Sequence, residues 1–326
     1  MPSSEPRFLP EPTAKDVAWL FPGQGAQEVG MGFDLWRGSA AARRVYETAD
    51  RVLGYKLSEV CFHGPDERLR ETDVTQPAVF VASLACLAAA VESGLVRERP
   101  ALMAGHSLGE YTALVAAGAL SLEEGLLLLR ARAGLMAAAG RANPGTLAAI
   151  IGLDEAAVLA ICREADVDAC NLNLPSQTVI GGAREAVARA MALAKERGAQ
   201  RAVELNVSGA FHSRLMAPAA AGLAVALKEA PIQAPAVSVV ANSTAEPLAG
   251  AGAVRDELAR QVASPVRWHE SVTLMATAGV STFIEFGPGR VLTGFVRRLV
   301  PGAVLVNVSS LADAVGERKG GVSSRT

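Results

Sequence analysis

A serine flanked by small residues is the strongest chemical feature of the sequence. Gly105-His106-Ser107-Leu108-Gly109 follows a short apolar run and precedes an Ala-rich segment of helical period, which is the context in which G-x-S-x-G forms a sharp strand-to-helix turn. Such a turn exposes the serine hydroxyl, and the amides of the following helix favour negative charge on a carbonyl oxygen under attack. The pattern predicts a nucleophile at Ser107, with an ordinary glycine-rich turn as the alternative.

A serine nucleophile needs a base within hydrogen-bond reach, and the chain has four histidines. His106 precedes the serine directly, so its side chain should leave the backbone in another direction. His63 lies in a Gly-Pro loop, and His269 lies early in an expected helix as a surface or capping residue. His212 opens a helix 105 residues after Ser107, in the order that α/β hydrolases use. We predict His212 as the base, with a hydrogen-bonded helix N-terminal histidine as the alternative.

A loop dense in small residues, Phe21–Gln27, follows the first expected strand. It can be a simple turn. Alternatively, its backbone approaches a ligand closely, and an amide near Gln24 pairs with that of Leu108 to form an oxyanion hole. Between Ser107 and His212, no acidic residue stands in a convincing loop to orient the base as hydrolases do.

Two further side chains could select a substrate. Arg130 and Arg132 lie in an otherwise apolar helical segment. An arginine there is normally a surface residue with a buried stem, but a guanidinium that points into a cleft clamps a carboxylate with two parallel hydrogen bonds. Phe211, next to His212, either narrows the space around a bound acyl group or is a buried aromatic at the end of a strand.

The elements expected around these residues follow an α/β pattern. Short β-branched runs alternate with long Ala/Leu-rich segments of helical period, which predicts a mainly parallel sheet. The expected strands are Val17–Phe21, Leu102–Gly105, Leu147–Ile151, Thr178–Ile180, Arg201–Val207, Val237–Ala241, Thr282–Phe286 and Val304–Val308. The expected helices are Ala40–Leu53, Ala78–Val91, Leu108–Ala117, Leu122–Ala139, Asp154–Glu164, Arg184–Arg197, Ser213–Lys228, Val254–Val262, Val266–Ala278 and Arg290–Leu299. The breaker Asn143-Pro144-Gly145 is followed by strand, helix, strand, helix and strand, which indicates an inserted subdomain.

Composition excludes several classes of function. The 326 residues are 50% hydrophobic and 20% charged, enough for a sizeable core. A net charge of −2 is unsuited to holding nucleic acid. The longest apolar stretch, Val79–Val91, is interrupted by Ser83 and is shorter than the ~20 residues of a membrane span. The polar N-terminus lacks the apolar core of a signal peptide. Four cysteines without metal-ligand spacing predict core thiols, no metal site and a cytoplasmic protein.

Seven motifs in register resemble the malonyl-CoA:acyl carrier protein transacylases, from about Val17 to Ser310. They are FPGQGAQ at Phe21–Gln27, TQPA at Thr75–Ala78, GHSLGEY at Gly105–Tyr111, NLNLPSQ at Asn171–Gln177, GAFHS at Gly209–Ser213, SPVRW at Ser264–Trp268 and FGPG at Phe286–Gly289. The resemblance implies an α/β fold with an α/β-hydrolase-like catalytic subdomain at residues 15–141 and 209–311. It also implies an inserted ferredoxin-like subdomain at 142–208. Mobile tails are expected at 1–14 and 312–326.

The resemblance also implies roles for individual residues. In place of an acid, the backbone carbonyl of Gln261 accepts a hydrogen bond from the imidazole of the base, so that a Ser-His dyad suffices for catalysis. The arginine that binds the substrate carboxylate lies four residues before a methionine, which makes it Arg132 and leaves Arg130 solvated. Phe beside the base accompanies malonyl in the resembling families, where Ser accompanies methylmalonyl, which supports a substrate contact at Phe211. Asn173 and Gln177 fall in the family's loop near the cleft. We also expect His106 to line the substrate site.

The activity implied is a ping-pong transfer of malonyl from CoA, through an ester at Ser107, to the phosphopantetheine thiol of an acyl carrier protein. No metal or redox cofactor is implied. We expect a discrete, monomeric cytoplasmic protein that serves fatty acid synthesis or acts in trans on a polyketide synthase. Two alternatives stay open: a serine hydrolase that removes acyl groups from carrier proteins, and an inactive docking module for carrier proteins.

Overall fold

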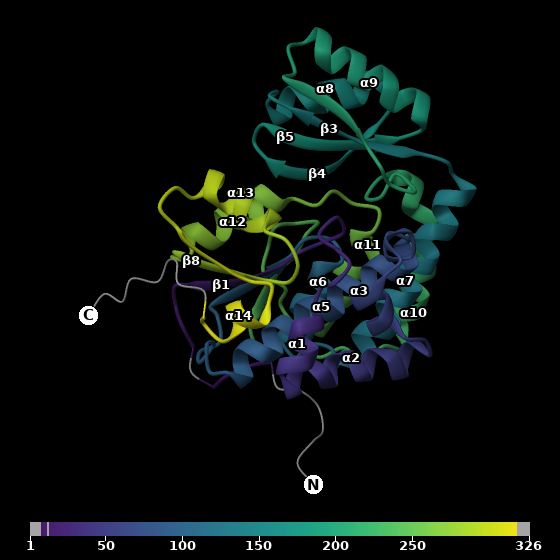
Figure 1. The fold of residues 1–326 in the computed structure, drawn as a ribbon. Helices are drawn as coiled ribbons and strands as arrows, with labels where there is room; N and C mark the ends of the chain where they lie inside the picture. Colours follow the sequence, from purple (N-terminus) through teal and green to yellow (C-terminus); the bar gives the residue numbers. More distant parts are fainter. Residues whose placement is uncertain (1–7, 12, 318–326) are drawn as a thin grey trace.

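A parallel sheet of five strands forms the centre of the larger part of the molecule (Figure 1). The computed structural model describes residues 8–11 and 13–317. The strand order is β7-β2-β1-β8-β9, and every neighbouring pair is parallel. The strands are β1 (Val17–Phe21), β2 (Leu102–Gly105), β7 (Ser238–Val240), β8 (Thr282–Phe286) and β9 (Val304–Val308). Four of these have the predicted bounds, and β7 is shorter at both ends. Because the strands are parallel, the loops after β1, β2, β7 and β8 meet at one edge.

Helices cover both faces of this sheet, as the alternation of strand and helix requires. They are α1 (Phe33–Gly38), α2 (Ala40–Leu53), α3 (Leu57–His63), α4 (Asp66–Leu69), α5 (Thr72–Glu92), α6 (Gly109–Ala116), α7 (Leu122–Ala142), α10 (Ala217–Lys228), α11 (Ala251–Gln261), α12 (Trp268–Thr277), α13 (Val291–Leu299) and α14 (Leu311–Ala314). The short helices α1, α3, α4 and α14 were not predicted, since fewer than two or three turns leave little periodicity to read. The predicted helix 213–228 divides into a 3₁₀ turn at Arg214–Met216 and α10.

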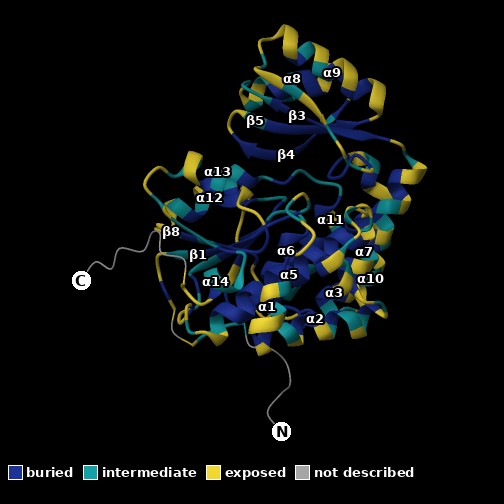
Figure 2. Cartoon of the chain, viewed as in Figure 1, coloured by how far each residue is buried: buried dark blue, intermediate teal, exposed yellow. Residues whose placement is uncertain are grey.

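Helix α5 runs through the middle of the larger core (Figure 2). It begins six residues before the predicted Ala78 and contains Pro77. Of the described helices, it alone is long and apolar enough to cross a membrane, but 94% of its apolar window is buried inside the protein. Its surroundings are those of a core helix.

A separate antiparallel sheet of four strands carries the order β4-β5-β3-β6. Its strands are β3 (Thr146–Ile151), β4 (Asp168–Leu174), β5 (Gln177–Gly182) and β6 (Arg201–Leu205), and its helices are α8 (Glu155–Ala165) and α9 (Arg184–Glu196). The sequence of elements is β-α-β-β-α-β, which together with this strand order is the ferredoxin-like arrangement. β4 was not predicted. NLNLPSQ, expected as a loop, instead forms the end of β4, the hairpin turn and the start of β5.

The two faces of the antiparallel sheet have different partners because side chains alternate along each strand. Ala148 and Ile150 face α8 and α9, which lie on the side away from the parallel sheet (Figure 1). Leu147 and Ala149 face a cluster that includes Met136 of α7. The second cluster fixes the small sheet over the edge of the large one.

Backbone hydrogen bonds also join the two sheets. Leu172 N–H donates to Val266 O at 2.8 Å, and Val266 N–H donates to Cys170 O at 2.9 Å, so the SPVRW segment adds a short parallel bridge to β4. At the same seam, His269 of α12 bonds Glu155 of α8 at 2.8 Å. His269 is therefore a half-buried contact between the two parts and not a simple surface residue.

The proposed domain boundaries at 141/142 and 208/209 stay a prediction; β3 to β6 all fall between them. The predicted tails were too long. Ala14 N–H donates to Arg99 O at 2.9 Å, and Ala312 to Ala314 belong to α14, where Ala314 O accepts from Ser93 at 2.5 Å. Residues 1–7, 12 and 318–326 lie outside the described part of the chain.

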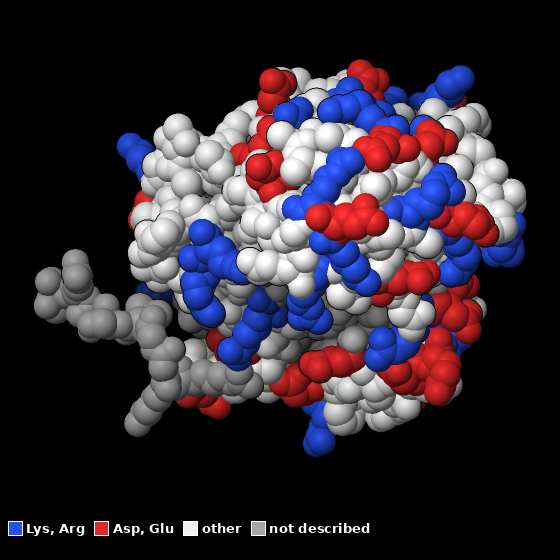
Figure 3. All heavy atoms as spheres, turned by 90° about the horizontal axis from the view of Figure 1, so that it is seen from above, with Lys and Arg blue, Asp and Glu red and all other residues white. Residues whose placement is uncertain are grey.

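Acidic and basic side chains intermingle over much of the face seen from above the small sheet (Figure 3). Most of the ion pairs formed by described residues are between exposed partners, such as Arg51 with Glu123 and Arg214 with Asp166. Pairs of this kind contribute little to stability.

Candidate active site

Ser107 lies in the turn between β2 and α6, with a φ of 55°. Gly105 and Gly109 make this turn possible: a Cβ on Gly105 would overlap the carbonyl of Gly109, and one on Gly109 would overlap the carbonyl of Phe21. Asn242, just after β7, holds the turn from below, because its Nδ2 donates to Gly105 O at 2.7 Å and its Oδ1 accepts from Ser107 N–H at 2.7 Å. The predicted strand-to-helix turn at Ser107 is therefore present.

His212 meets Ser107 as predicted. Its Nε2 is 2.7 Å from Ser107 Oγ, and its Nδ1 is 3.0 Å from Gln261 O and 3.2 Å from Ser264 O. Two carbonyl acceptors require a proton on Nδ1, which leaves Nε2 free to accept the serine proton. Burial lowers the pKa of His212 to about 3, and the charge of Arg132 lowers it as well. The imidazole is therefore neutral at physiological pH.

Arg132 is buried beside the serine, only 1% exposed. Its Nη1 donates to Gln76 Oε1 at 2.6 Å, and its Nη2 donates to Ser107 Oγ at 3.0 Å and to Gln261 Oε1 at 2.9 Å. None of these partners is an acid, so the guanidinium keeps its charge available for an anionic ligand. Arg130, two residues earlier, is exposed, which agrees with the predicted division of the two arginines.

A cavity of about 630 Å³ opens above these groups, between the edge of the parallel sheet and the antiparallel sheet. Ser107, His212 and Arg132 line it, together with four other residues predicted or expected at the site: Gln24, Leu108, His106 and Phe211. Phe211 is both a cavity residue and a core residue, only 6% exposed. The cavity has room for a small acyl group and the arm that carries it.

The amides expected as an oxyanion hole lie at the cavity. Leu108 caps the N-terminus of α6, and Gln24 follows β1 at the neighbouring strand end. Within the described residues, neither backbone N–H has a hydrogen-bond acceptor, so both can donate to a ligand.

Asn173 does not line the cavity, contrary to its expected role as a substrate contact. It sits on β4 at an irregularity in the pairing with β5, where the register shifts between Leu172 and Leu174, so it does not follow the regular alternation that would place it on the same face as Asn171. Its Oδ1 is 2.9 Å from His106 Nε2. Burial lowers the pKa of His106, so the neutral ring donates to Asn173. Asn173 thus holds His106, which is at the cavity.

Three side chains of the site were not predicted: Gln76, Glu110 and Asn242. Gln76 and Glu110 lie within the TQPA and GHSLGEY motifs, which were the available signal; Asn242 had none, because only the fold brings it under the Ser107 turn. Glu110 is fully buried and accepts hydrogen bonds from Asn242 N–H at 2.8 Å and from Gln261 Nε2 at 2.7 Å.

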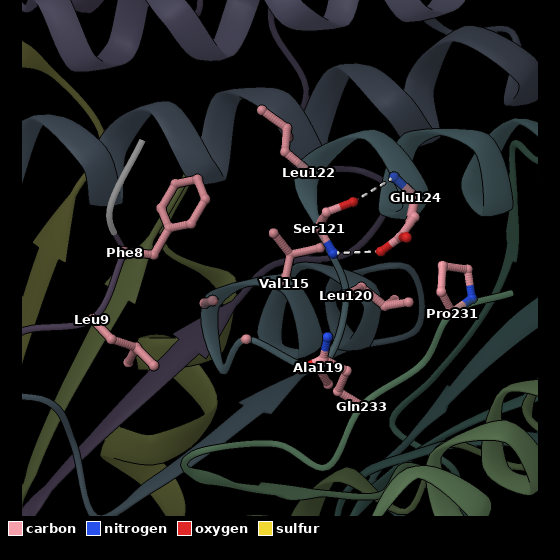
Figure 4. A pocket seen from close by; sticks show the side chains of 12 residues that line it. Phe8, Leu9, Val115, Ala119, Leu120, Ser121, Leu122, Glu124, Pro231 and Gln233 are labelled. Carbon is pink, nitrogen blue, oxygen red and sulfur yellow. Dashed lines mark hydrogen bonds between the residues drawn. The ribbon is translucent and has the colours of Figure 1, made fainter. Parts of the chain in front are cut away.

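A second cavity, of about 460 Å³, lies at the other end of α6 (Figure 4). Val115, Ala119 and Leu122 line it, and Phe8 and Leu9 pass along its edge. Its main polar feature is the capping box at the start of α7, where Ser121 and Glu124 satisfy each other's backbone amides. No group that could act as a nucleophile with its base gathers there among the described residues.

Glu155, His269 and Glu270 bring possible metal-ligand atoms within 4.8 Å of one another. Arg267 donates to both carboxylate oxygens of Glu270, at 2.8 and 2.6 Å. A guanidinium already bound to one of the carboxylates opposes a second cation. We therefore assign these residues to the contact between α8 and α12.

Comparisons with known proteins agree with this geometry. The acyl transferase domain family matches residues 18–312. The chain is 43% identical to the malonyl CoA-acyl carrier protein transacylase of Bacillus subtilis, over 87% of this chain and 90% of that protein. It superposes with a TM-score of 0.89 and 42% identity on an acyl carrier protein S-malonyltransferase from Vibrio cholerae, covering 93% and 100% of the two chains. A malonyl-transacylase solved in complex with its type II PKS acyl-carrier protein matches with a TM-score of 0.87 and 40% identity, covering 93% and 100%.

Proposed function

The chain belongs to the acyl transferase family, and on this basis we propose that it moves a malonyl group from malonyl-CoA to an acyl carrier protein. The observation that carries the proposal is the convergence of three groups at one cavity. Ser107 Oγ lies 2.7 Å from His212 Nε2 and 3.0 Å from Arg132 Nη2. A nucleophile, its base and a buried cation together suit an acyl group that ends in a carboxylate.

In the first half-reaction, His212 Nε2 takes the Ser107 proton as Oγ bonds to the thioester carbonyl carbon. The Arg132 bond to Oγ supports the negative charge that develops there, and the amides of Gln24 and Leu108 hold the carbonyl oxygen as it becomes an oxyanion. When the C–S bond breaks, the proton on Nε2 passes to the sulfur and CoA leaves as a thiol. Gln261 O keeps the imidazole oriented throughout.

The second half-reaction reverses these steps with a different thiol. The phosphopantetheine thiol of the carrier gives its proton to His212 Nε2, its sulfur attacks the ester carbonyl, and Ser107 recovers the proton. Meanwhile Arg132 binds the malonyl carboxylate. A thioester becomes an ester and then a thioester again, so the balance of atoms and electrons calls for no metal or redox cofactor.

We further propose that the protein works as a monomer in the cytoplasm, supplying fatty acid synthesis or, in trans, a polyketide synthase. Ser107, His212 and Arg132 all come from one chain, which supports a monomer. The four cysteines are free and buried, which suits a reducing compartment. Relatives carry both kinds of name: transacylases, and a Burkholderia thailandensis polyketide biosynthesis protein that is 42% identical over 87% of this chain but only 24% of that longer protein.

Intact-mass measurement tests the proposal. The protein mixed with malonyl-CoA should gain one malonyl group, which peptide mapping places on Ser107, and should lose it to an added acyl carrier protein. Ser107→Ala should gain nothing, since no other hydroxyl among the described residues has this base beside it. Malonyl on another residue would contradict the mechanism, and release of free malonate in place of malonyl-carrier would identify a hydrolase.

A further inference from the structure

Glu110 is a buried acid that touches neither the cavity nor the reacting atoms, yet it joins two residues, Asn242 and Gln261, that hydrogen-bond the backbone of Ser107. Its Oε1 accepts from Asn242 N–H at 2.8 Å and from Asn242 Nδ2 at 3.3 Å. Its Oε2 accepts from Gln261 Nε2 at 2.7 Å. Both oxygens only accept, which is the pattern of a carboxylate. Burial, followed by the charge of Glu257, raises the pKa of Glu110 well above its usual value, although the hydrogen bonds from Asn242 and Gln261 and the charge of Arg132 oppose this rise.

The side-chain amide of Gln261 has one orientation that satisfies all its neighbours. Its Nε2 donates to Glu110 Oε2 and, at 2.8 Å, to Ser107 O. This turns its Oε1 toward Arg132 Nη2, which donates to it at 2.9 Å. If the amide were reversed, its NH₂ group would face the guanidinium and its oxygen would face two acceptors, each a buried group left without a partner.

We propose that Glu110 is a positioning residue for malonyl selectivity: by accepting from Gln261 Nε2, it turns the Gln261 amide oxygen toward Arg132 and so fixes the guanidinium that binds the substrate carboxylate. This deepens the proposed function and rests on it. The amide also keeps the acid one residue away from the guanidinium, so Glu110 orients Arg132 without occupying the place of the substrate carboxylate.

Glu110→Gln tests the proposal with almost no change in shape. The backbone N–H of Asn242 can only donate, so the oxygen of the new amide stays on that side and its NH₂ group faces Gln261. The new NH₂ group then faces the NH₂ group of Gln261, and the clash of two donors displaces the Gln261 amide from its place beside Arg132. We expect kcat/KM for malonyl-CoA to fall about 10-fold or more, with a raised KM. The value for acetyl-CoA, which has no carboxylate, should fall less, so the malonyl-to-acetyl ratio drops.

Glu285→Gln is the matched control. Glu285 is another fully buried glutamate that does not line the cavity. It accepts hydrogen bonds from Leu292 and Thr293 at the start of α13 and from Asn307 of β9. Its replacement should lower stability but leave the malonyl-to-acetyl ratio at the parent value. If Glu110→Gln does not fold, Glu110→Asp replaces it. Because the aspartate side chain is one methylene too short to reach Gln261, this variant should give the same malonyl-selective loss.

Two outcomes would overturn the inference. Equal losses on both substrates would mean that Glu110 is only structural. A lower KM for malonyl-CoA would mean that Glu110 acts only through its negative charge. That charge partly offsets the positive charge of Arg132, so its removal would strengthen the binding of the substrate carboxylate. The parent protein separates this result from the proposed function: if the parent does not take malonyl onto Ser107, the function fails, and if it does, only the role of Glu110 is in question.

Discussion

Ser107 Oγ lies between the neutral base His212 and the buried cation Arg132, and both groups favour removal of the serine proton. Burial and, after it, the charge of Arg132 lower the pKa of His212, so the imidazole stays unprotonated and free to accept a proton. The same guanidinium donates to Ser107 Oγ at 3.0 Å, which favours the alkoxide that the base creates. In the proposed mechanism, one arginine therefore serves the nucleophile as well as the substrate carboxylate.

Arg132→Ala should change substrate preference. It removes the partner of a buried carboxylate, a loss of ~2–5 kcal/mol, so kcat/KM for malonyl-CoA should fall about 30-fold or more. Acetyl transfer should fall much less, through the lost bond to Ser107. Arg130→Ala, on the exposed face of the same helix, is the control and should behave like the parent. Equal losses on the two substrates would make Arg132 a structural residue.

Acid should destabilise the folded state through His212. Its pKa is about 3 when folded, against 6.5 as the ordinary value. Between these pH values the unfolded chain binds the extra proton, so the free energy of unfolding falls as pH falls, by up to about 1.4 kcal/mol per pH unit from this group. Denaturant titrations at pH 7 and 5 should show a smaller decrease for His212→Asn than for the parent. Parallel decreases would contradict the low pKa.

At the scale of elements, the site depends on how closely β1, β2 and α6 approach one another. Gly105 and Gly109 let the carbonyls of neighbouring segments pass where a side chain would stand. Similarly, a Cβ on Gly287, after β8, would overlap Ser83 Oγ of α5 and lie 2.8 Å from Pro22 Cγ. The loops at this edge of the sheet thus pack too closely for a side chain at any of these three glycines.

Two glycine replacements should have opposite effects on stability. Gly109→Ala forces a methyl group into the carbonyl of Phe21 and should cost ~1–3 kcal/mol, with a large loss of acylation because the Leu108 amide moves. Gly134→Ala lies on the exposed side of α7 with open space around the new Cβ. It should stabilise the protein by up to ~1 kcal/mol, because alanine is the better helix former. Denaturation midpoints of both variants measure this, and a stable, active Gly109→Ala would contradict the packing argument.

At the scale of the whole molecule, the active site lies where two sheets meet. The large sheet supplies Ser107, and the small sheet supplies Asn173, which bonds the neighbouring His106 at 2.9 Å. The chain crosses between the two parts twice, and the bridge between β4 and Val266 adds a third connection. The cavity is therefore held between two firmly joined bodies.

Asn173→Ala should weaken this junction without altering selectivity. It leaves a buried N–H of His106 without a partner, which should cost ~1–3 kcal/mol of stability. Because Asn173 does not contact Arg132, kcat/KM should fall by a similar factor for malonyl-CoA and acetyl-CoA. Unfolding curves and kinetics with both substrates check this. A malonyl-selective loss would instead place Asn173 in the recognition of the carboxylate.

The sequence by itself determined the parts whose chemistry is local. The G-x-S-x-G turn, the bounds of β1, β2, β8 and β9, and the choice of His212 follow from short-range patterns and from the scarcity of histidines. The resemblance of its motifs to a known family added the division between Arg132 and Arg130 and the carbonyl of Gln261. The structure places His212, Arg132 and the carbonyl of Gln261 together around Ser107, and leaves Arg130 exposed.

Only the tertiary structure decided how these groups are held. Asn242 follows the edge strand β7, Gln76 lies inside α5, and Glu110 lies in α6, so no spacing in the chain shows that they meet. β4 was missed because the resemblance placed this motif in a loop, although Leu172 and Leu174 alternate with Asn171 and Asn173 as in a strand. The strand pairs with β5 and with Val266, which lie elsewhere in the chain. Hydrogen bonds between distant segments depend on packing, and packing is a property of the whole fold.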